Sequence, residues 1–334
     1  MHSSLEVLPD DLKDKLSKKD MPDWTDPMLA TLTHTHFSDP GWIYERKLDG
    51  ERSLFFGDNG DFKIYSRNKK QQNSFFPEIA QAGANLEGHF IMDGEIVTFD
   101  GDVTSFSRLQ NRMHIQNPDE ELQHNYPVYA YIFDLIYFDG CDLGALPVTA
   151  RKKVLKDAFE FEYPLRYLPH RKEHGKKYLE EACQKDWEGL IAKEADSKYI
   201  HGRSKKWLKF KCGHGQELVI GGYTKPEGER TGFGALLVGH YDTDKEKLHY
   251  AGKVGTGYDE EFLKKFHGKL QKTKRKTCPF ADFDESNDEN ITWVSPQYVG
   301  EIGFTEWTES GKLRHPRFLG LRKDKDPKDV IKEE

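Results

Sequence analysis

The chain has 334 residues, which suits two domains better than one. Apolar residues make up 36% and charged residues 32%, and the net charge of −7 argues mildly against nucleic acid as a partner, since nucleic-acid-binding proteins are usually basic. Positive charge is concentrated locally, however: residues 203–211 hold five cations and residues 264–276 hold seven, with no acid in either run. The average charge therefore does not exclude a basic groove.

Neither secretion nor membrane insertion is indicated. The first residues do not form a signal peptide, and no apolar run approaches the roughly 18 residues of a membrane span. The four cysteines show no metal-binding spacing, which predicts reduced thiols in a reducing compartment. We expect a cytoplasmic, monomeric protein without membrane contact.

The first two thirds of the chain predict an α+β domain with mainly antiparallel sheet. A polar lead over residues 1–24 contains one weak predicted helix from Asp10 to Lys19. Alternating apolar segments bounded by turn residues then predict strands, and longer periodic segments predict helices. The expected strands are 41–48, 52–57, 61–66, 88–99, 128–138 and 190–192, and the expected helices are 149–160 and 175–186.

The remainder predicts a small β-rich domain. Cys-Gly-His-Gly at 212–215 indicates a linker, and short strands with glycine turns follow it. Five strands and one helix suit an OB-type β-barrel, while the charged end predicts a loose tail. The expected strands are 216–223, 234–242, 247–254, 292–304 and 312–319, and the expected helix is 258–270. The predicted organisation is a lead (1–24), an α+β domain (25–212), a barrel domain (213–322) and a tail (323–334).

Residues 45–52, Glu-Arg-Lys-Leu-Asp-Gly-Glu-Arg, carry the most informative motif. Lys47 lies at the end of an expected strand, and Gly50 lets the chain turn into the next. If the strand persists, Glu45, Lys47 and Asp49 share one face. The two arginines of the motif disfavour a further positive charge, which would leave the lysine amine free to act as a nucleophile. Taken alone, the motif also fits a surface hairpin with an ion pair.

Residues 207–211 alternate apolar and basic side chains. In a strand, Lys209 and Lys211 point to one face, and Leu208 and Phe210 point to the other. Two lysines on one face repel each other unless an anion lies between them, so the pattern predicts a phosphate site.

Other motifs each allow two interpretations. Glu95, in Asp-Gly-Glu, is either a ribose or magnesium ligand or part of a hairpin turn. Phe133 either stacks on a purine ring or belongs to the core. Glu188 and Lys193 bracket an apolar strand, either as a metal ligand and a phosphate contact or as solvated strand ends. Residues 314–325 form a last cationic cluster or a charged tail, and no Walker-type phosphate loop occurs.

In their order, these motifs resemble the nucleotidyltransferase motifs of ATP-dependent DNA ligases. The segments at 27–31 and 105–112 make the chain most similar to the ligase domain of bacterial ligase D. At 69–72 the chain has Lys-Lys-Gln-Gln where that family has a glycine-bearing turn, which affects the expected DNA contacts near 67–75. The motifs that carry the resemblance are Lys-x-Asp-Gly-x-Arg (47–52), Asp-Gly-Glu (93–95), Phe-Asp-Leu (133–135), Glu-Gly-Leu-Ile-x-Lys (188–193), Trp-x-Lys-x-Lys (207–211) and Arg-x-Pro-x-Phe-x-Gly-Leu-Arg-x-Asp-Lys (314–325).

The resemblance implies a nucleotidyltransferase domain followed by an OB-fold domain, forming a stand-alone minimal ligase that uses ATP with Mg²⁺ or Mn²⁺. Lys47 would form a lysyl-AMP, with Glu45 at the adenine edge and Phe133 on the ring. Glu95 and Glu188 would be the metal-linked carboxylates. The other implied site residues are Asp49 beside the nucleophile, Arg52, Arg67, Lys193 and Arg203 at the nucleotide or nick phosphate, Lys209 and Lys211 at the α-phosphate, and Arg314, Arg317, Arg322, Asp324 and Lys325 at the leaving pyrophosphate.

The implied substrate is nicked or broken duplex DNA, held by the two basic runs, and no motif identifies a DNA-end-binding or clamp partner. An RNA ligase or an mRNA capping enzyme is the nearest alternative, and the Arg-x-Asp-Lys ending favours a ligase over a capping enzyme. A non-catalytic DNA-end-binding module is an alternative of another class. The sequence argues against such a module, because the expected charged residue is present at every charged position of the six motifs.

Overall fold

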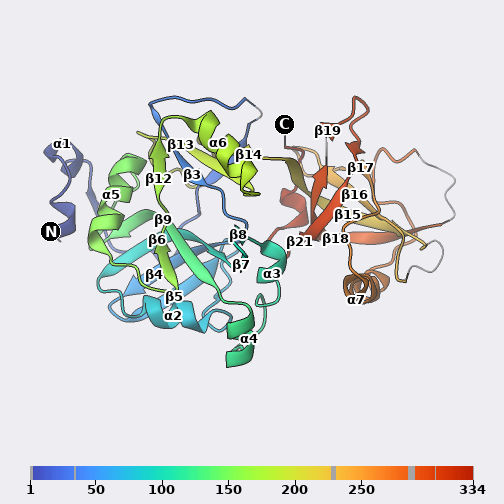
Figure 1. Ribbon diagram of the computed structural model, residues 1–334, viewed down its shortest axis with the longest axis horizontal. Helices are drawn as coiled ribbons and strands as arrows, with labels where there is room; N and C mark the ends of the chain where they lie inside the picture. Colours follow the sequence, from blue (N-terminus) through green and yellow to red (C-terminus); the bar gives the residue numbers. More distant parts are fainter. Residues whose placement is uncertain (1–2, 34, 227–230, 285–289, 305, 334) are drawn as a thin grey trace. The chain divides into compact units, whose positions relative to one another are not determined.

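The computed structural model describes residues 3–33, 35–226, 231–284, 290–304 and 306–333 (Figure 1). Contacts divide the chain into two compact units, Met1–Cys212 and Gly213–Glu334. Each unit is described by itself.

A seven-stranded sheet runs through unit 1, with aromatic and branched residues along its central strands. Its strand order is β1-β10-β9-β6-β4-β5, and β11 pairs with β9 off this path. Among the described residues, β11 and β9 form the one parallel pair of this sheet. The strands are β1 (Ser17–Lys18), β4 (Glu51–Asp58), β5 (Asp61–Ser66), β6 (His89–Val97), β9 (Tyr129–Phe138), β10 (Cys141–Asp142) and β11 (Leu165–Tyr167).

A second sheet of five strands, in the order β12-β3-β13-β14-β2, faces the first. Ile43 and Trp207 from this sheet share one apolar cluster with Ile91 and Phe133 from the seven-stranded sheet, so the two sheets bury a common core. Its strands are β2 (Leu29–Leu32), β3 (Trp42–Arg46), β12 (His170–Lys172), β13 (Gly189–Glu194) and β14 (Arg203–Lys211).

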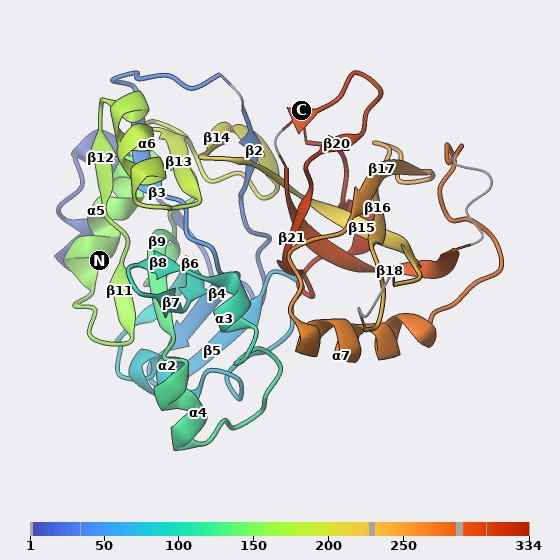
Figure 2. The same ribbon diagram turned by 45° about the vertical axis from the view of Figure 1, so that its right-hand side comes forward.

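Helices cover the outer faces of both sheets. Val154 and Leu155 of α5 (Val148–Ala158) pack into the core on the far side of the seven-stranded sheet. Tyr178 and Leu179 of α6 (Gly175–Gln184) pack against the five-stranded sheet, where Figure 2 shows α6 beside β13. In the described ranges, no helix is both long and apolar enough to cross a bilayer. The shorter elements are η1 (Ser3–Leu5), α1 (Asp10–Lys13), α2 (Pro77–Gly83), α3 (Phe106–Leu109), α4 (Glu120–Asn125) and the hairpin of β7 (Phe99–Asp100) and β8 (Val103–Thr104).

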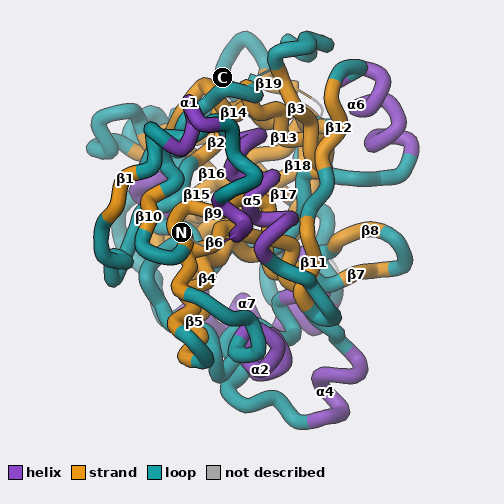
Figure 3. The backbone as a smooth tube through the Cα atoms, turned by 90° about the vertical axis from the view of Figure 1, so that its left-hand side faces the viewer, coloured by secondary structure: helices purple, strands orange, loops and turns teal. Residues whose placement is uncertain are grey.

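Unit 2 is built on a five-stranded antiparallel sheet in the order β17-β16-β15-β18-β21, and all five strands are labelled in Figure 1. Figure 3, which colours strands orange, labels four of them, β15 to β18. Helix α7 (Glu260–Gln271) buries Leu263, Phe266 and Leu270 in the core, and their spacing places them on one helical face. The strands are β15 (His214–Thr224), β16 (Leu236–Tyr241), β17 (Leu248–Val254), β18 (Ile291–Phe304) and β21 (Arg317–Leu321), accompanied by the pair β19 (Glu306–Trp307) and β20 (Leu313–Arg314) and by η2 (Pro327–Asp329).

Both ends of the chain pack against its units, so the expectations of a polar lead and a loose tail are wrong. The lead buries Leu5 and Leu8, which are 0% and 2% exposed. The helix expected over 10–19 ends at Lys13 because the following residues form β1 against β10. In the tail, Val330 is 5% exposed, and Ile331 accepts a 2.9 Å hydrogen bond from the side chain of Gln216. Apolar residues among the charged ones hold both segments in place.

The cysteines also differ from expectation. Cys183, in α6, and Cys212, directly after β14, form a disulfide with their Cα atoms 5.1 Å apart, while Cys141 and Cys278 are free. Sequence spacing did not predict this pairing because the two residues meet only where α6 packs on the sheet.

We predict that protein purified without reductant takes up two maleimide groups per chain after denaturation, and four after reduction, because only two thiols are free. Intact-mass spectrometry counts the additions. The C183S variant should take up three groups without reduction. Two react with the free thiols and the third with Cys212, which has lost its disulfide partner. Four additions to the unreduced parent chain would contradict the disulfide.

Candidate active site

Lys47 lies directly after the last residue of β3, as the sequence predicts. Its backbone N–H donates to the carbonyl of Gly189 at 2.9 Å, which fastens this turn to the start of β13. Its ammonium forms an ion pair with the carboxylate of Glu188. The two side chains are 18% and 26% exposed, so the pair is accessible from solvent. The structure thus brings the predicted nucleophile to a predicted metal ligand.

The arginines of the motif have other partners in the structure than the expectation assumed. Arg46 lies over the ring of Trp187, with its Cζ 4.2 Å from the ring centroid. Arg52 forms a two-pronged ion pair with Asp93, with both N–O distances at 2.5 Å. The charge paired with Lys47 is therefore a carboxylate, and the amine has to leave this partner to react.

Asp49 and Gly50 shape the turn after Lys47. Asp49 accepts a 3.0 Å hydrogen bond from the backbone N–H of Phe106, and its own N–H donates to the hydroxyl of Thr104 at 3.0 Å. A Cβ on Gly50 would come within 2.2 Å of the carbonyl oxygen of Ile96, so the close approach of β6 requires glycine there. Because β3 has already ended, the expectation of one continuous face for the motif's alternate residues is wrong. Asp49 instead anchors the turn.

Glu45 is buried in a cluster of three charged side chains. It is 1% exposed, and its two oxygens lie 2.6 Å from the ammonium of Lys152 and 2.7 Å from that of Lys193. Burial alone would raise the pKa of Glu45, but the two ammonium groups outweigh it and hold the pKa below its usual value. Burial, assisted by Lys152, lowers the pKa of Lys193 to about 8. Lys193 is 1% exposed and does not lie open to a phosphate, contrary to expectation.

Sequence reasoning missed Lys152, although its position in α5 indicates its role. Val148, Lys152, Leu155 and Phe159 are spaced at 4, 3 and 4 residues, and all four are buried. They form the apolar stripe of the helix. A lysine within such a stripe predicts a buried carboxylate partner, since an unpaired buried charge is strongly unfavourable.

The ring of Phe133 lies beside this cluster and is 6% exposed. The Cζ of Arg52 and the Nζ of Lys193 lie 4.4 and 4.5 Å from its centroid. Trp207, the first residue of the Trp-x-Lys-x-Lys motif, meets it edge-on at 6.3 Å. Tyr199 completes the surroundings by donating its hydroxyl hydrogen to Asp93 at 2.5 Å. Phe133 thus belongs to the core and also lies at the charged site.

The two lysines of β14 share a face, which confirms the prediction from alternation. Trp207 has the same parity as Lys209 and Lys211, and its contact with Phe133 shows that this face looks toward the seven-stranded sheet. Phe210, of the other parity, is buried against α6. Lys211 pairs in register with Gly189, next to Glu188, so the Lys211 end of the basic strand segment approaches the Lys47 turn.

The remaining predicted residues of unit 1 lie on β4 to β6 and at the start of β14. Glu95 is directly opposite Arg52 in the register of β6 and β4. Arg203, exposed at the start of β14, donates to the carbonyl of Ala30 at 3.1 Å. Arg67 is half-buried in the turn after β5. In the same turn Lys69 has a φ of 61°, so a lysine occupies the left-handed position that a glycine favours.

The described residues contain no group of three or more His, Cys, Asp or Glu side chains placed to hold a metal ion. The carboxylates of Glu95 and Glu188 nevertheless offer the oxygen ligands that a hard cation prefers. Magnesium is commonly bound by one or two carboxylates together with substrate phosphates. The donor set therefore fits Mg²⁺ held jointly with a nucleotide.

In unit 2, the residues of the closing motif differ in exposure. Arg314 and Arg317 are exposed. Arg322 donates two hydrogen bonds to Asp324, at 3.0 and 2.8 Å, and Lys325 lies 3.0 Å from the carboxylate of Glu217. Their role at a leaving pyrophosphate stays a prediction.

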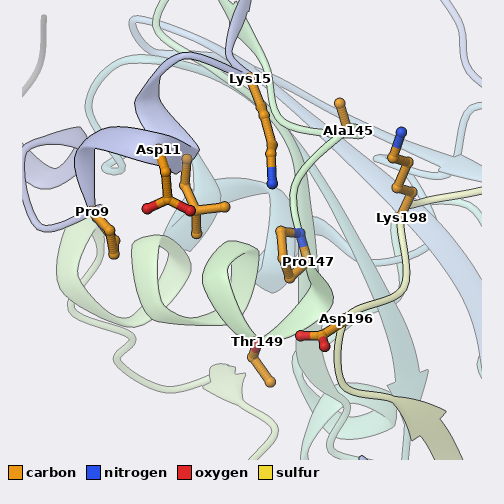
Figure 4. A pocket seen from close by; sticks show the side chains of 9 residues that line it. Pro9, Asp11, Lys15, Ala145, Pro147, Thr149, Asp196 and Lys198 are labelled. Atoms are coloured by element: carbon orange, nitrogen blue, oxygen red, sulfur yellow. The ribbon is translucent and has the colours of Figure 1, made fainter.

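One cavity of unit 1, of about 670 Å³, lies away from this centre (Figure 4). Side chains of both charges line it, from the N-terminal segment and from the loops before α5 and after β13. None of the predicted site residues takes part, so we assign the cavity no role in the site. Its lining residues are Pro9, Asp11, Leu12, Lys15, Ala145, Pro147, Thr149, Asp196 and Lys198.

Comparison with known proteins agrees with this geometry. A family model for the ATP dependent DNA ligase domain matches residues 27–211, and one for the ATP dependent DNA ligase C terminal region matches residues 229–325. Unit 1 is thus a nucleotidyltransferase domain and unit 2 an OB-fold domain. The chain belongs to the ATP-dependent DNA ligase family.

The chain is similar to parts of larger proteins. It is 35% identical over 323 residues to the multifunctional non-homologous end joining protein LigD of Pseudomonas aeruginosa, covering 95% of this chain and 37% of that protein. It is 28% identical to DNA ligase 1 of Schizosaccharomyces pombe, covering 93% and 46%. It therefore spans less than half the length of either relative. The structure of a mycobacterial DNA ligase D complexed with ATP and MES matches it with a TM-score of 0.65 and 32% identity, covering 92% of this chain and 98% of that one.

We predict that Lys152→Met lowers the free energy of unfolding by about 3 to 5 kcal/mol, because it removes one of the two cations that compensate the buried Glu45 carboxylate. Urea unfolding measures the change. Lys156→Met makes the same chemical change at an exposed position of α5 and should have little effect. Equal effects of the two substitutions would contradict the assigned role.

His170, on β12 opposite Glu45, provides a test of pH dependence. Burial and the nearby Lys152 lower its pKa from 6.5 to about 4. The unfolded chain therefore binds more protons than the folded one between these values, and stability falls as the pH falls through this window. His170→Gln should make the dependence shallower, by up to about 1.4 kcal/mol per pH unit. Urea unfolding from pH 4.5 to 6.5 measures it, and the exposed His124→Gln is the control. An unchanged slope in His170→Gln would contradict the prediction.

Proposed function

We propose that this chain seals breaks in duplex DNA that carry a 3′-hydroxyl and a 5′-phosphate, at the expense of ATP. The observation that carries the proposal is the Lys47 amine, partly exposed beside Glu188 and approached by the lysine face of β14. Membership of the ATP-dependent DNA ligase family supports it.

In the first step, the Nζ of Lys47 attacks the α-phosphorus of ATP. The ammonium first releases a proton to solvent, and the neutral amine then forms the P–N bond. The P–O bond to the β-phosphate breaks, pyrophosphate leaves with the bond electrons, and the nitrogen releases a second proton to solvent. Lys209 and Lys211 bind the α-phosphate and neutralise its growing charge. Magnesium held by Glu188 and Glu95, for which manganese can substitute, would supply further neutralisation of the phosphate oxygens. Asp49 keeps the turn that presents Lys47 in place.

In the second step, an oxygen of the DNA 5′-phosphate attacks the adenylyl phosphorus. The P–N bond breaks and a pyrophosphate linkage forms. In the third step, the 3′-hydroxyl oxygen attacks the activated 5′-phosphate, and AMP leaves with the bond electrons. Arg52, Arg67 and Arg203 contact the nucleotide or the nick phosphate, while Phe133 and the Glu45 cluster hold the adenine.

The residues of unit 2 act on the leaving group and the DNA. Arg314, Arg317, Arg322, Asp324 and Lys325 orient pyrophosphate in the first step. The basic runs at 203–211 and 264–276 contact the DNA backbone, which gives salt-sensitive binding without sequence preference. We propose that the protein acts as a monomer in the cytoplasm.

Two experiments separate this function from its alternatives. Incubation with labelled ATP or labelled GTP distinguishes a ligase from a capping enzyme, which would retain labelled GMP. A sealing assay on nicked duplexes with DNA or RNA strands distinguishes a DNA ligase from an RNA ligase. A non-catalytic end-binding module would bind the duplexes, but it would retain no label after denaturation.

We predict that protein incubated with ATP and magnesium gains one AMP, located on Lys47 by peptide mass spectrometry. Lys47→Ala should lose the adduct and all sealing of unmodified nicks, because no other amine replaces the nucleophile. Lys205→Ala, an exposed lysine of β14, is the control and should keep the adduct. AMP on another side chain would overturn the assignment.

A further inference from the structure

Glu217 and Glu301 form a paired acidic site on the sheet of unit 2. They are directly opposite each other in the register of β15 and β18. Like charges in this arrangement repel and destabilise a sheet. The next pair on the same face, Val219 and Val299, is 0% and 2% exposed and belongs to an apolar core. Two residues along each strand, this face of the sheet therefore changes from a pair of valines to a pair of glutamates.

The closing motif supplies the cations that offset this repulsion. One guanidinium nitrogen of Arg322 lies 3.9 Å from a carboxylate oxygen of Glu217 and 3.8 Å from one of Glu301. The ammonium of Lys325 lies 3.0 Å from Glu217. The backbone N–H of Arg322 donates to the carbonyl of Val299 at 2.7 Å, so the motif is fastened where the acidic pair begins.

Asp324 completes the cluster and orients the guanidinium. It accepts two parallel hydrogen bonds from Arg322, at 3.0 and 2.8 Å, which fixes the plane of that side chain. In the ion pairs given above, three carboxylates meet two cations. The side chains of Arg322 and Asp324 are 13% and 9% exposed. Such an arrangement is costly to desolvate, and apolar residues of similar size often stabilise a protein as well or better. Stability alone therefore gives little reason for two opposed glutamates here.

We infer that Glu217 and Glu301 are positioning residues for the adenylation step: they hold Arg322, and Glu217 also holds Lys325, in the orientation from which the closing motif acts on the leaving pyrophosphate. This inference rests on the proposed function. Neither glutamate touches the reacting atoms. Lys325 lies 3.0 Å from Glu217, closer than Arg322 lies to either glutamate, so we expect the larger effect at Glu217.

The test separates adenylation from sealing in the chain of 334 residues. Glu217→Gln keeps the side-chain shape but removes the charge. We expect it to slow formation of lysyl-AMP by about 10-fold or more, mainly through kcat, while sealing of a chemically pre-adenylated nick keeps its rate. Glu301→Gln should show the same division with a smaller effect. Glu260→Gln, at an exposed position of α7, is the matched control and should change neither rate.

Two outcomes would overturn the inference. One is an unchanged rate of lysyl-AMP formation in both glutamine variants. The other is an equal fall in adenylation and in sealing of the pre-adenylated nick, accompanied by a lower Tm, which is what a purely structural role would produce. Failure of the proposed function is distinguishable, because the unsubstituted chain would then form no lysyl-AMP and seal no nick.

Discussion

The compensation of the buried Glu45 carboxylate is the interaction on which the site depends. Glu45 comes from β3, Lys193 from β13 of the same sheet, and Lys152 from α5, which packs on the opposite sheet. A buried charge of this kind tolerates little displacement, since losing either cation leaves a costly uncompensated carboxylate. The cluster therefore links α5 to both sheets. It does so at Glu45, two residues before the proposed nucleophile Lys47.

A consequence is that Lys47 itself can remain loosely held. Its backbone is fixed by Gly189 and by the turn at Asp49, while its side chain is partly exposed and paired only through charge with Glu188 among the contacts described above. Rigid support beneath a movable amine suits a group that has to accept an adenylyl group and then pass it on. The same division recurs in unit 2, where a half-buried ion cluster supports a motif whose other arginines, Arg314 and Arg317, are exposed.

The chain's local patterns predicted much of this arrangement. Alternation placed Lys209 and Lys211 on one face, and the strand that ends at Arg46, directly before Lys47, lies where its flanking residues indicate. The environments of individual side chains were predicted less well: Arg46 and Arg52 have partners far along the chain, Lys193 is buried, and the disulfide joins residues 29 positions apart.

The sequence by itself determined which residue types lie at strand ends and on which strand face, because these follow from the two-residue repeat of a strand and the chemistry of turns. Only the tertiary structure decided which charge meets which. Lys152 contacts Glu45, Glu188 contacts Lys47, and Glu217 contacts Lys325 across sequence separations that no local pattern encodes. Electrostatic energy depends on distance and burial in space, and both are established only when sheets and helices pack.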